Sequence, residues 1–136
     1  HEYASNYNFD TRFIIIPGVL HCESSWAGGT TEYALDAIQA AIDNKHYNCP
    51  VPLDTKLPMI HVDDLVCGMV ALMQAPSEIF DSRVNCRGIC LAGFSFTPNE
   101  LFSLILNYYP NFTASYDPNI SPNATKFALT WPDSLD

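Results

Sequence analysis

The chain has 136 residues, of which 48% are hydrophobic and 15% charged, the composition of one modest globular domain. Its net charge of −9 argues against binding to a nucleic-acid backbone or to an anionic membrane surface, because both attract basic faces. No apolar run approaches the roughly 18–20 residues that a membrane-spanning helix needs. The first residues resemble no signal or transit peptide, and the absence of an initial Met leads us to expect a fragment or a processed form.

Cysteine use favours a reduced, intracellular protein. The number of cysteines is odd and no C-x-x-C pair occurs, which favours free thiols over a disulfide framework. Three N-x-[ST] tripeptides, at 111–113, 119–121 and 123–125, point instead to glycosylation, but such tripeptides often arise by chance in Asn- and Thr-rich loops. The cysteines are Cys22, Cys49, Cys67, Cys86 and Cys90.

The first part of the chain predicts a buried strand followed by a helix. Residues 12–16 are a continuous β-branched and aromatic run ended by Pro-Gly, which is typical of a strand buried on both faces and then a turn. The small residues of 27–31 permit a tight backbone, and Thr30 or Thr31 is expected to cap a helix that runs to about Asn44. One face of that helix is apolar and expected to be buried. It consists of Tyr33, Ala34, Ala37, Ile38, Ala41 and Ile42.

The middle of the chain predicts a strand, a helix and a further strand. Residues 59–62 are a short strand candidate. Asp63 or Asp64 is then expected to cap a helix through Gln74, whose body is apolar nearly all round and is therefore expected to be deeply packed. Residues 83–87 are another short strand candidate.

The last part opens with a strong helix signal and then weakens. Thr97, Pro98 and Glu100 occupy the N-cap, the first position and the third position of a capping box. Residues 111–136 are rich in loop-forming types and are expected to contain at most one strand, near 114–116. Strands alternating with helices predict an α/β fold, with too few strands for a complete doubly wound domain.

Self-contained catalytic equipment is missing from these 136 residues. They contain no G-x-G-x-x-G, no P-loop, no G-x-S-x-G and no Y-x-x-x-K. The four histidines form no metal-binding pair at helical spacing, so no metal site is predicted.

Two local features have both a functional and a structural interpretation. His61 beside Asp63 and Asp64 has the makings of a general base, but a strand end followed by a helix N-cap explains the same residues and is favoured. Trp131, in a polar loop, can close a substrate pocket or fill a hydrophobic gap, and its residue chemistry alone favours the gap.

Six collinear segments resemble the L-threonine 3-dehydrogenases, within the sugar-epimerase-like branch of the extended short-chain dehydrogenases. Residues 28–34, Gly-Gly-Thr-Thr-Glu-Tyr-Ala, resemble the family's G-G-T-T-[DE]-Y-A, and 54–64 resemble its D-T-[RK]-L-P-M-x-x-x-D-D. Each segment alone is weakly specific, whereas six in the family's order and spacing are strongly specific. The other four segments are 13–19, 73–76, 94–101 and 131–136.

The resemblance implies the C-terminal half of an enzyme. In the family, NAD takes a hydride from C3 of L-threonine to give 2-amino-3-ketobutyrate, and the Tyr and Lys of Y-x-x-x-K handle the proton. The fold implied for this chain is the C-terminal part of a Rossmann-type parallel sheet, with 1–26 as the last part of the dinucleotide-binding domain, and a smaller substrate-binding lobe, mainly 27–136. Family membership also implies an intracellular, mitochondrial location.

Site residues carry over only where the motifs match. The resemblance implies cofactor contacts from the turn at Pro17, Gly18 and Val19, and substrate contacts from Gly29, Thr30, Thr31 and Trp131. This raises the pocket interpretation of Trp131 above the gap-filling one. The chain departs from the family at Ala27, where a third Gly is usual, at His61, where Tyr is common, and over 107–125.

Two accounts of the whole protein remain open. In the first, the chain is the substrate-binding portion of a threonine dehydrogenase, inactive without an N-terminal half, with L-threonine as ligand and a homodimer or larger complex as its state. In the second, it is a truncated, catalytically dead relative that serves as a structural subunit or docks on a scaffold. A nucleotide-sugar epimerase relative is a weaker third account, because the Gly-Thr-Thr and Leu-Pro-Met segments argue against it.

Overall fold

The computed structural model describes residues 6–7, 10–22, 29–79, 88–91 and 93–133, and these form an α/β structure. Three pairs of strands, β1 with β5, β2 with β4 and β3 with β7, run parallel. A further strand, β6, adds antiparallel to β4, which makes β4 the centre of a three-stranded sheet. The α/β class with parallel pairing is therefore confirmed. The strands are β1 (Phe13–Ile15), β2 (Gly18–Leu20), β3 (Tyr47–Cys49), β4 (Leu57–His61), β5 (Gly88–Cys90), β6 (Phe94–Phe96) and β7 (Ala114–Tyr116).

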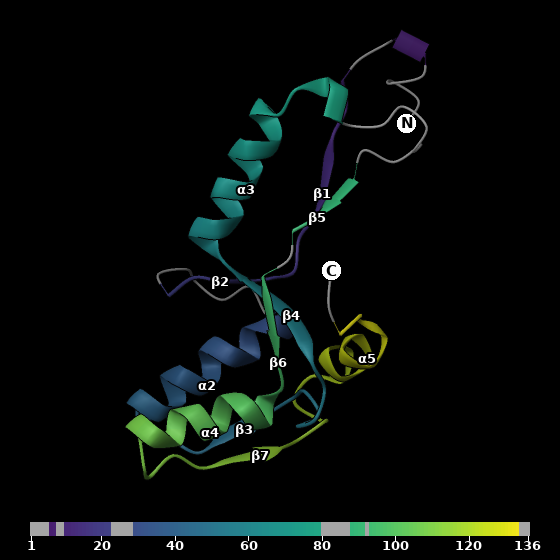
Figure 1. The fold of residues 1–136 in the computed structure, drawn as a ribbon. Helices are drawn as coiled ribbons and strands as arrows, with labels where there is room; N and C mark the ends of the chain where they lie inside the picture. The colour runs from purple at the N-terminus through teal and green to yellow at the C-terminus, as the bar shows by residue number, and fades with distance from the viewer. Residues whose placement is uncertain (1–5, 8–9, 23–28, 80–87, 92, 134–136) are drawn as a thin grey trace.

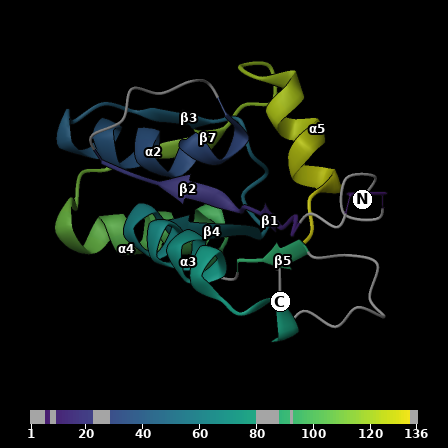
Figure 2. The same cartoon turned by 90° about the horizontal axis from the view of Figure 1, so that it is seen from above.

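The helices divide between two ends of the molecule (Figures 1 and 2). Helices α2 and α4 lie side by side with β3 and β7 at one end, whereas α3 lies at the other end beside β1 and β5. Helix α5 packs against the short helix η1. None of the helices in the described ranges is long and apolar enough to cross a membrane. The helices are η1 (Thr30–Glu32), α2 (Tyr33–Ile42), α3 (Val62–Gln74), η2 (Ser77–Ile79), α4 (Pro98–Tyr108) and α5 (Pro122–Thr130).

The core is built from aromatic and aliphatic side chains of α2, α4 and the strands between them. Tyr33 of α2 and Met59 of β4 are almost completely buried. The ring of Phe102 on α4 lies 6.1 Å from that of Tyr47 and 5.6 Å from that of Phe112, both edge-on, an arrangement that aromatic pairs prefer. These contacts fix α4 against β3 and the loop before β7.

The capping box that begins α4 is confirmed in both of its hydrogen bonds. The Glu100 amide donates to Thr97 Oγ1 at 3.2 Å, and the Thr97 amide donates to Glu100 Oε2 at 2.8 Å. Pro98 stands at the first helical position, where its missing N–H costs nothing. This helix start depends only on neighbouring residues, which explains why the sequence predicts it well.

The expectation of a strand over 12–16 buried on both faces is wrong. Only 13–15 form β1, and Phe13 is 47% exposed, because β5 is its sole strand partner within the described ranges. Pro-Gly does not form a free turn either. Pro17 is buried, and Gly18 opens β2, which pairs with β4.

The helix expected from Thr30 or Thr31 begins later and buries fewer residues. Residues 30–32 form the helix η1 without a side-chain cap, and α2 follows from Tyr33. Ile38 and Ile42 are exposed rather than buried, since the core contacts the narrower stripe of Tyr33 and the alanines. The end predicted near Asn44 is confirmed: α2 stops at Ile42, and Asn44 takes the left-handed conformation (φ 53°) common after helices.

The strand at 59–62 is confirmed as part of β4, but two expectations about α3 are wrong. His61, not Asp63 or Asp64, is the N-cap, and its Nδ1 accepts a hydrogen bond from the Asp63 amide at 3.3 Å. Deep packing is also wrong, because Leu72 is the single buried residue of this helix and Met73 is 80% exposed. An apolar sequence all round a helix needs neighbours on every side to be buried, and the described residues supply them on one side only.

The C-terminal part holds more structure than the sequence predicts. The strand near 114–116 is confirmed as β7, but α5 follows it where only loop is expected. Ser121 Oγ accepts a hydrogen bond from the Ala124 amide at 3.3 Å, and Pro122 stands in the first turn. Strands β3 and β6 are also unpredicted, and the strand candidate at 83–87 lies outside the described residues.

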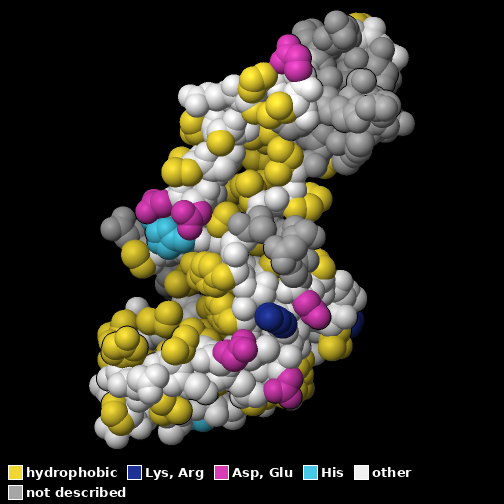
Figure 3. All heavy atoms as spheres, viewed as in Figure 1, with side chains coloured by type: hydrophobic (Ala, Val, Ile, Leu, Met, Phe, Trp, Pro, Cys, Tyr) yellow, Lys and Arg dark blue, Asp and Glu magenta, His cyan; other side chains and the backbone are white. Residues whose placement is uncertain are grey.

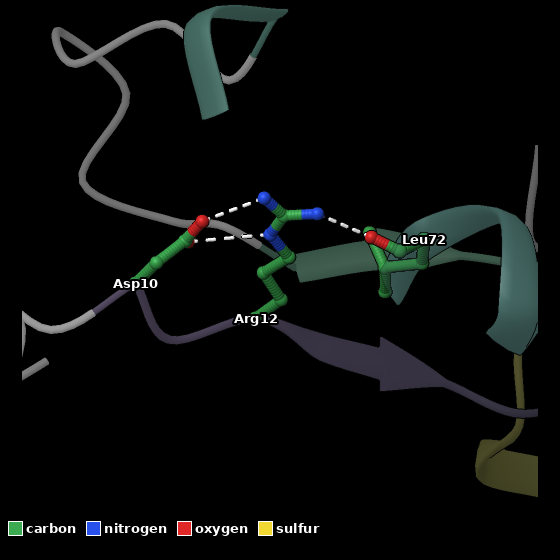
Figure 4. A network of polar contacts seen from close by, with 3 residues as sticks. All are labelled: Asp10, Arg12 and Leu72. Carbon is green, nitrogen blue, oxygen red and sulfur yellow. Dashed lines mark hydrogen bonds and ion pairs between the residues drawn. The ribbon is translucent and has the colours of Figure 1, made fainter. Parts of the chain in front are cut away.

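Arg12 joins the start of β1 to the end of α3 (Figure 4). Its guanidinium donates to both carboxylate oxygens of Asp10, at 3.2 and 2.6 Å, and to the backbone carbonyl of Leu72. The hydrogen bond to Asp10 raises the pKa of Arg12. Because the last carbonyls of a helix lack partners within the helix, a cation at this point satisfies one of them and stabilises the end of α3.

Candidate functional site

A hollow of about 370 Å³ lies where η1, β4 and α5 meet. It is open to solvent on one side, and none of its described lining residues is an Asp, Glu, Lys, Arg or His. Hydroxyl, amide and backbone groups therefore supply its polarity, and aromatic and aliphatic side chains supply the rest. The lining residues are Gly29, Thr30, Thr31, Leu57, Ser121, Asn123, Ala124, Phe127 and Trp131.

The four predicted substrate residues come together in this hollow, although about a hundred positions of sequence separate the first three from the last. The Glu32 amide donates to the Gly29 carbonyl at 3.1 Å and closes the turn that carries Thr30 and Thr31. Trp131 follows the last turn of α5, where its amide donates to the Phe127 carbonyl at 2.9 Å. The structure thus assembles the residues, and their role in substrate binding stays a prediction.

Trp131 satisfies both interpretations that the sequence left open. It lines the hollow and also packs against the buried core, with its ring 6.2 Å from that of Phe127. Its indole Nε1 is buried and has no hydrogen-bond partner in the structure. A buried donor without an acceptor is uncommon and costs free energy. Among the described residues that line the hollow, Trp131 is the one with such a buried and unsatisfied side-chain atom.

The predicted cofactor residues lie next to the hollow and not in its lining. Pro17 and Gly18 are buried, whereas the Val19 side chain is 36% exposed on β2, the edge strand of its sheet. Gly18 touches the substrate segment: a Cβ on it would stand 2.5 Å from Cβ of Thr31. The structure therefore brings the two predicted contact segments into direct packing contact.

None of the described residues that line the hollow has an acid–base side chain. His61 is exposed at the end of β4, is not part of the lining and serves as a helix cap, which agrees with the favoured structural interpretation. Burial raises the pKa of the Cys49 thiol to about 11, which disfavours the nucleophilic thiolate. No cluster of potential metal ligands occurs among the described residues. The arrangement can bind a small molecule, and nothing described here transfers a proton to or from it.

Sequence reasoning missed the wall of the hollow that α5 provides. Leu57 lies just before the predicted strand at 59–62, and Ser121, Asn123, Ala124 and Phe127 lie in the stretch 111–136 that is expected to be rich in loops. One signal was available: Ser-Pro at 121–122 is a typical N-cap and first helical position.

Comparison with solved structures shows the fold class of the chain. The fold matches that of GalE-like dehydrogenases: a GalE-like L-threonine dehydrogenase from Cupriavidus necator superposes with a TM-score of 0.86 and 32% identity, covering 98% of this chain and 46% of that one. An L-threonine dehydrogenase from Clostridium difficile gives a TM-score of 0.87 and 32% identity over 99% of this chain and 41% of that one.

Sequence comparison then identifies particular relatives. Bovine mitochondrial L-threonine 3-dehydrogenase is 32% identical over 134 residues, which are 98% of this chain and 34% of that enzyme. An uncharacterized epimerase/dehydratase of Staphylococcus aureus is 33% identical over 98% of this chain and 40% of its own length. No family model matches the chain. The chain is homologous to L-threonine 3-dehydrogenases and epimerase/dehydratases, and it spans between a third and a half of their length, which fits a C-terminal part of them.

Proposed function

We propose that the chain is the substrate-binding portion of an NAD-dependent L-threonine 3-dehydrogenase, which oxidises L-threonine to 2-amino-3-ketobutyrate. The supporting observation is that Gly29, Thr30, Thr31 and Trp131 share one hollow, and that none of the lining residues the structure describes has a charged side chain. L-Threonine is a zwitterion without net charge, so hydroxyls and backbone N–H groups can hold its carboxylate and hydroxyl while the indole ring excludes water.

The cofactor fits this chain only in part. NAD, when bound, accepts the hydride from C3 of the substrate. Val19 offers an exposed apolar side chain at a sheet edge, which suits one face of a nicotinamide ring. Gly18, next to it, is buried against Thr31 and Met59. The 136 residues contain neither a glycine-rich phosphate cradle nor a Tyr and Lys spaced as Y-x-x-x-K. A dinucleotide-binding segment, in the same polypeptide or in a companion, is therefore part of the proposal, and the chain alone is expected to be inactive.

The surface of α3 and β1 is the proposed docking site for that segment. Figure 3 shows hydrophobic side chains gathered along α3. Those of α3 that are more than two-fifths exposed are Val66, Met69, Val70 and Met73, and Phe13 and Ile15 of β1 are exposed to a similar degree. Contiguous apolar patches on this scale mark surfaces that another protein segment covers. The alternative, a catalytically dead subunit of a larger complex, would use the same surface on a scaffold.

A mitochondrial location belongs to the same proposal, because the bovine relative is a mitochondrial enzyme. Bacterial relatives show that the fold is not tied to that organelle. Localisation of a tagged protein in its native cells would test this part, and a purely cytosolic signal would contradict it.

The decisive experiment begins with the native protein. Its intact mass and N-terminal sequence establish whether a dinucleotide-binding segment accompanies the chain, whose own mass is 15.1 kDa. The complete protein, or the chain combined with its companion, is then assayed for NADH formation that depends on L-threonine. Thr31→Ala should reduce kcat/KM about tenfold or more, the usual cost of removing a hydrogen bond to a charged group.

The matched control is Thr113→Ala. It removes a threonine hydroxyl that lies just before the distant strand β7 and is hydrogen-bonded to His46. It should leave the rate within about twofold, as surface changes away from a site do. A native chain of this mass with no companion, or a complete protein that forms no NADH from L-threonine, would overturn the proposal and favour the structural subunit.

A further inference from the structure

We propose that Gly18 is the positioning residue for Thr31: the missing side chain of the glycine is the seat into which the threonine methyl group fits. This inference rests on the proposed function, since it assigns to Gly18 a task in forming the amino-acid site in addition to any contact with the cofactor. It concerns a contact between β2 and η1, the two elements that the sequence assigns to the cofactor and the substrate.

The seat is defined by three distances. A Cβ placed on Gly18 would lie 2.5 Å from Cβ and 2.6 Å from Cγ2 of Thr31, and 2.6 Å from Sδ of Met59. Real Cβ atoms essentially never approach another heavy atom so closely. The space is therefore already filled, and it is filled by the side chain of Thr31 from one direction and by a buried Met59 from the other.

The backbone makes this seat rigid. Gly18 and Met59 are direct partners in the parallel register of β2 and β4, so hydrogen bonds on both strands fix their separation. Met59 is completely buried and has no room to withdraw. The element that would have to shift is therefore η1, which carries Thr31 and whose N-cap residue, Gly29, makes no side-chain hydrogen bond.

Thr31 thereby has two separable functions. Its Cβ and methyl group fill the seat against Gly18, and the residue also lines the hollow, where its hydroxyl is proposed to meet the substrate. A side chain on Gly18 would push η1 out of place and displace Thr31 and its neighbour Thr30 together. A shift on the order of 1 Å in a substrate-positioning group is enough to reduce turnover by about a hundredfold.

The test uses the complete, NAD-competent protein and three substitutions. Gly18→Ala fills the seat, Thr31→Ser keeps the hydroxyl but removes the methyl group that occupies it, and Thr31→Val keeps the methyl group but removes the hydroxyl. We expect Gly18→Ala to raise KM for L-threonine about tenfold or more. We expect Thr31→Ser to raise it by a smaller factor of about three, while the Kd of that variant for NAD changes by less than about twofold.

Gly68→Ala is the matched control, because it is also a crowded glycine. Its new Cβ would stand 2.9 Å from the end of the flexible Leu91 side chain, which can move aside, and Gly68 lies on α3 away from the hollow. KM for L-threonine should stay within about twofold of the wild-type value, as for other changes outside a site. Thermal unfolding of each variant separates a displaced turn from an unfolded protein.

A second readout needs neither substrate nor cofactor. In a Trp26→Phe background, Trp131 is the remaining tryptophan of the chain. Because Trp131 and η1 line the same hollow, Gly18→Ala should shift its fluorescence emission while far-UV circular dichroism is retained. An unchanged emission, or Gly18→Ala and Thr31→Ser proteins that bind L-threonine as the wild type does, would overturn the inference. If Thr31→Val weakens L-threonine binding and the other two variants do not, the proposed function stands and the positioning role of Gly18 is wrong. If the wild-type protein does not bind L-threonine, the proposed function itself fails.

Discussion

Two regions of the molecule have similar apolar content and different packing. The packed region, formed by α2, β3, β4, α4, β7, α5 and the loops that carry Val51 and Phe112, contains every buried residue of the main core cluster. In the open region, formed by β1, β5 and α3, Leu72 is the one buried residue of the helix, and apolar side chains gather on the surface along α3 (Figure 3). The exposed ones are Val66, Met69, Val70 and Met73 of α3 and Phe13 and Ile15 of β1. The difference shows that hydrophobic residues become a core only where a second layer covers them.

The largest expected contrast concerns stability. Phe102→Ala in the packed region removes a ring that contacts two others and should lower the free energy of unfolding by about 3–5 kcal/mol. Met73→Ala in the open region removes a side chain that is 80% exposed and should change it by less than about 0.5 kcal/mol. Urea denaturation measures both. Equal losses from the two variants would show that the open region is packed in solution.

A smaller effect is expected on association. Met73→Glu places a charge on the proposed docking surface and should weaken binding to the dinucleotide-binding segment about tenfold or more, because the carboxylate would have to be desolvated. Tyr108→Glu is the control, since Tyr108 is exposed to the same extent at the end of α4 in the packed region. Titration calorimetry of the two variants against the companion segment decides the matter, and equal weakening would place the docking surface elsewhere.

A still smaller difference in stability is expected between variants that remove the N-caps of α4 and α3. Thr97→Ala breaks the capping box of α4 and should cost about 1 kcal/mol of stability. His61→Ala removes the cap of α3, where the hydrogen bond is longer, at 3.3 Å, and the side chain is about half exposed, so a loss smaller than that of Thr97→Ala is expected. Denaturation midpoints of the two variants provide the comparison, and the reverse order would show that α3 carries more of the stability than its burial indicates.

A further effect appears as the pH rises above neutrality. Burial raises the pKa of Cys49 from 9.0 to about 11, so the folded chain keeps a proton that the unfolded chain releases. The contribution of Cys49 to stability is therefore constant below pH 9 and falls as the pH rises from 9 towards 11. Burial also raises the pKa of Tyr33 and of Tyr47, which extends the fall to higher pH. Denaturation at pH 8 and pH 10 measures the fall, and Cys49→Ala should reduce it; an unchanged slope would contradict the assignment.

Features that depend on neighbouring residues could be predicted from the sequence, whereas contacts between helices and sheets could not. The capping box at Thr97 and the end of α2 near Asn44 depend on adjacent residues, so their patterns predict them. The exposure of α3 depends on which elements pack against it, and the amino-acid pattern of the helix does not indicate whether such a partner is present. The hollow was half predicted: the Gly-Thr-Thr segment and Trp131 came from the family resemblance, whereas the wall from α5 was assigned to a loop.

The parallel strand pairs also bear on how the chain folds. Phe13 pairs with Gly88 and Tyr47 with Ala114. Each of these strand pairs therefore joins the two ends of a long loop of polypeptide. Contacts between residues far apart in sequence form late, because the entropy of closing the loop must be lost before the contact is gained. We therefore expect slow refolding of this chain, and during synthesis β3 must wait for its partner β7, with its strand edge open to other chains until then.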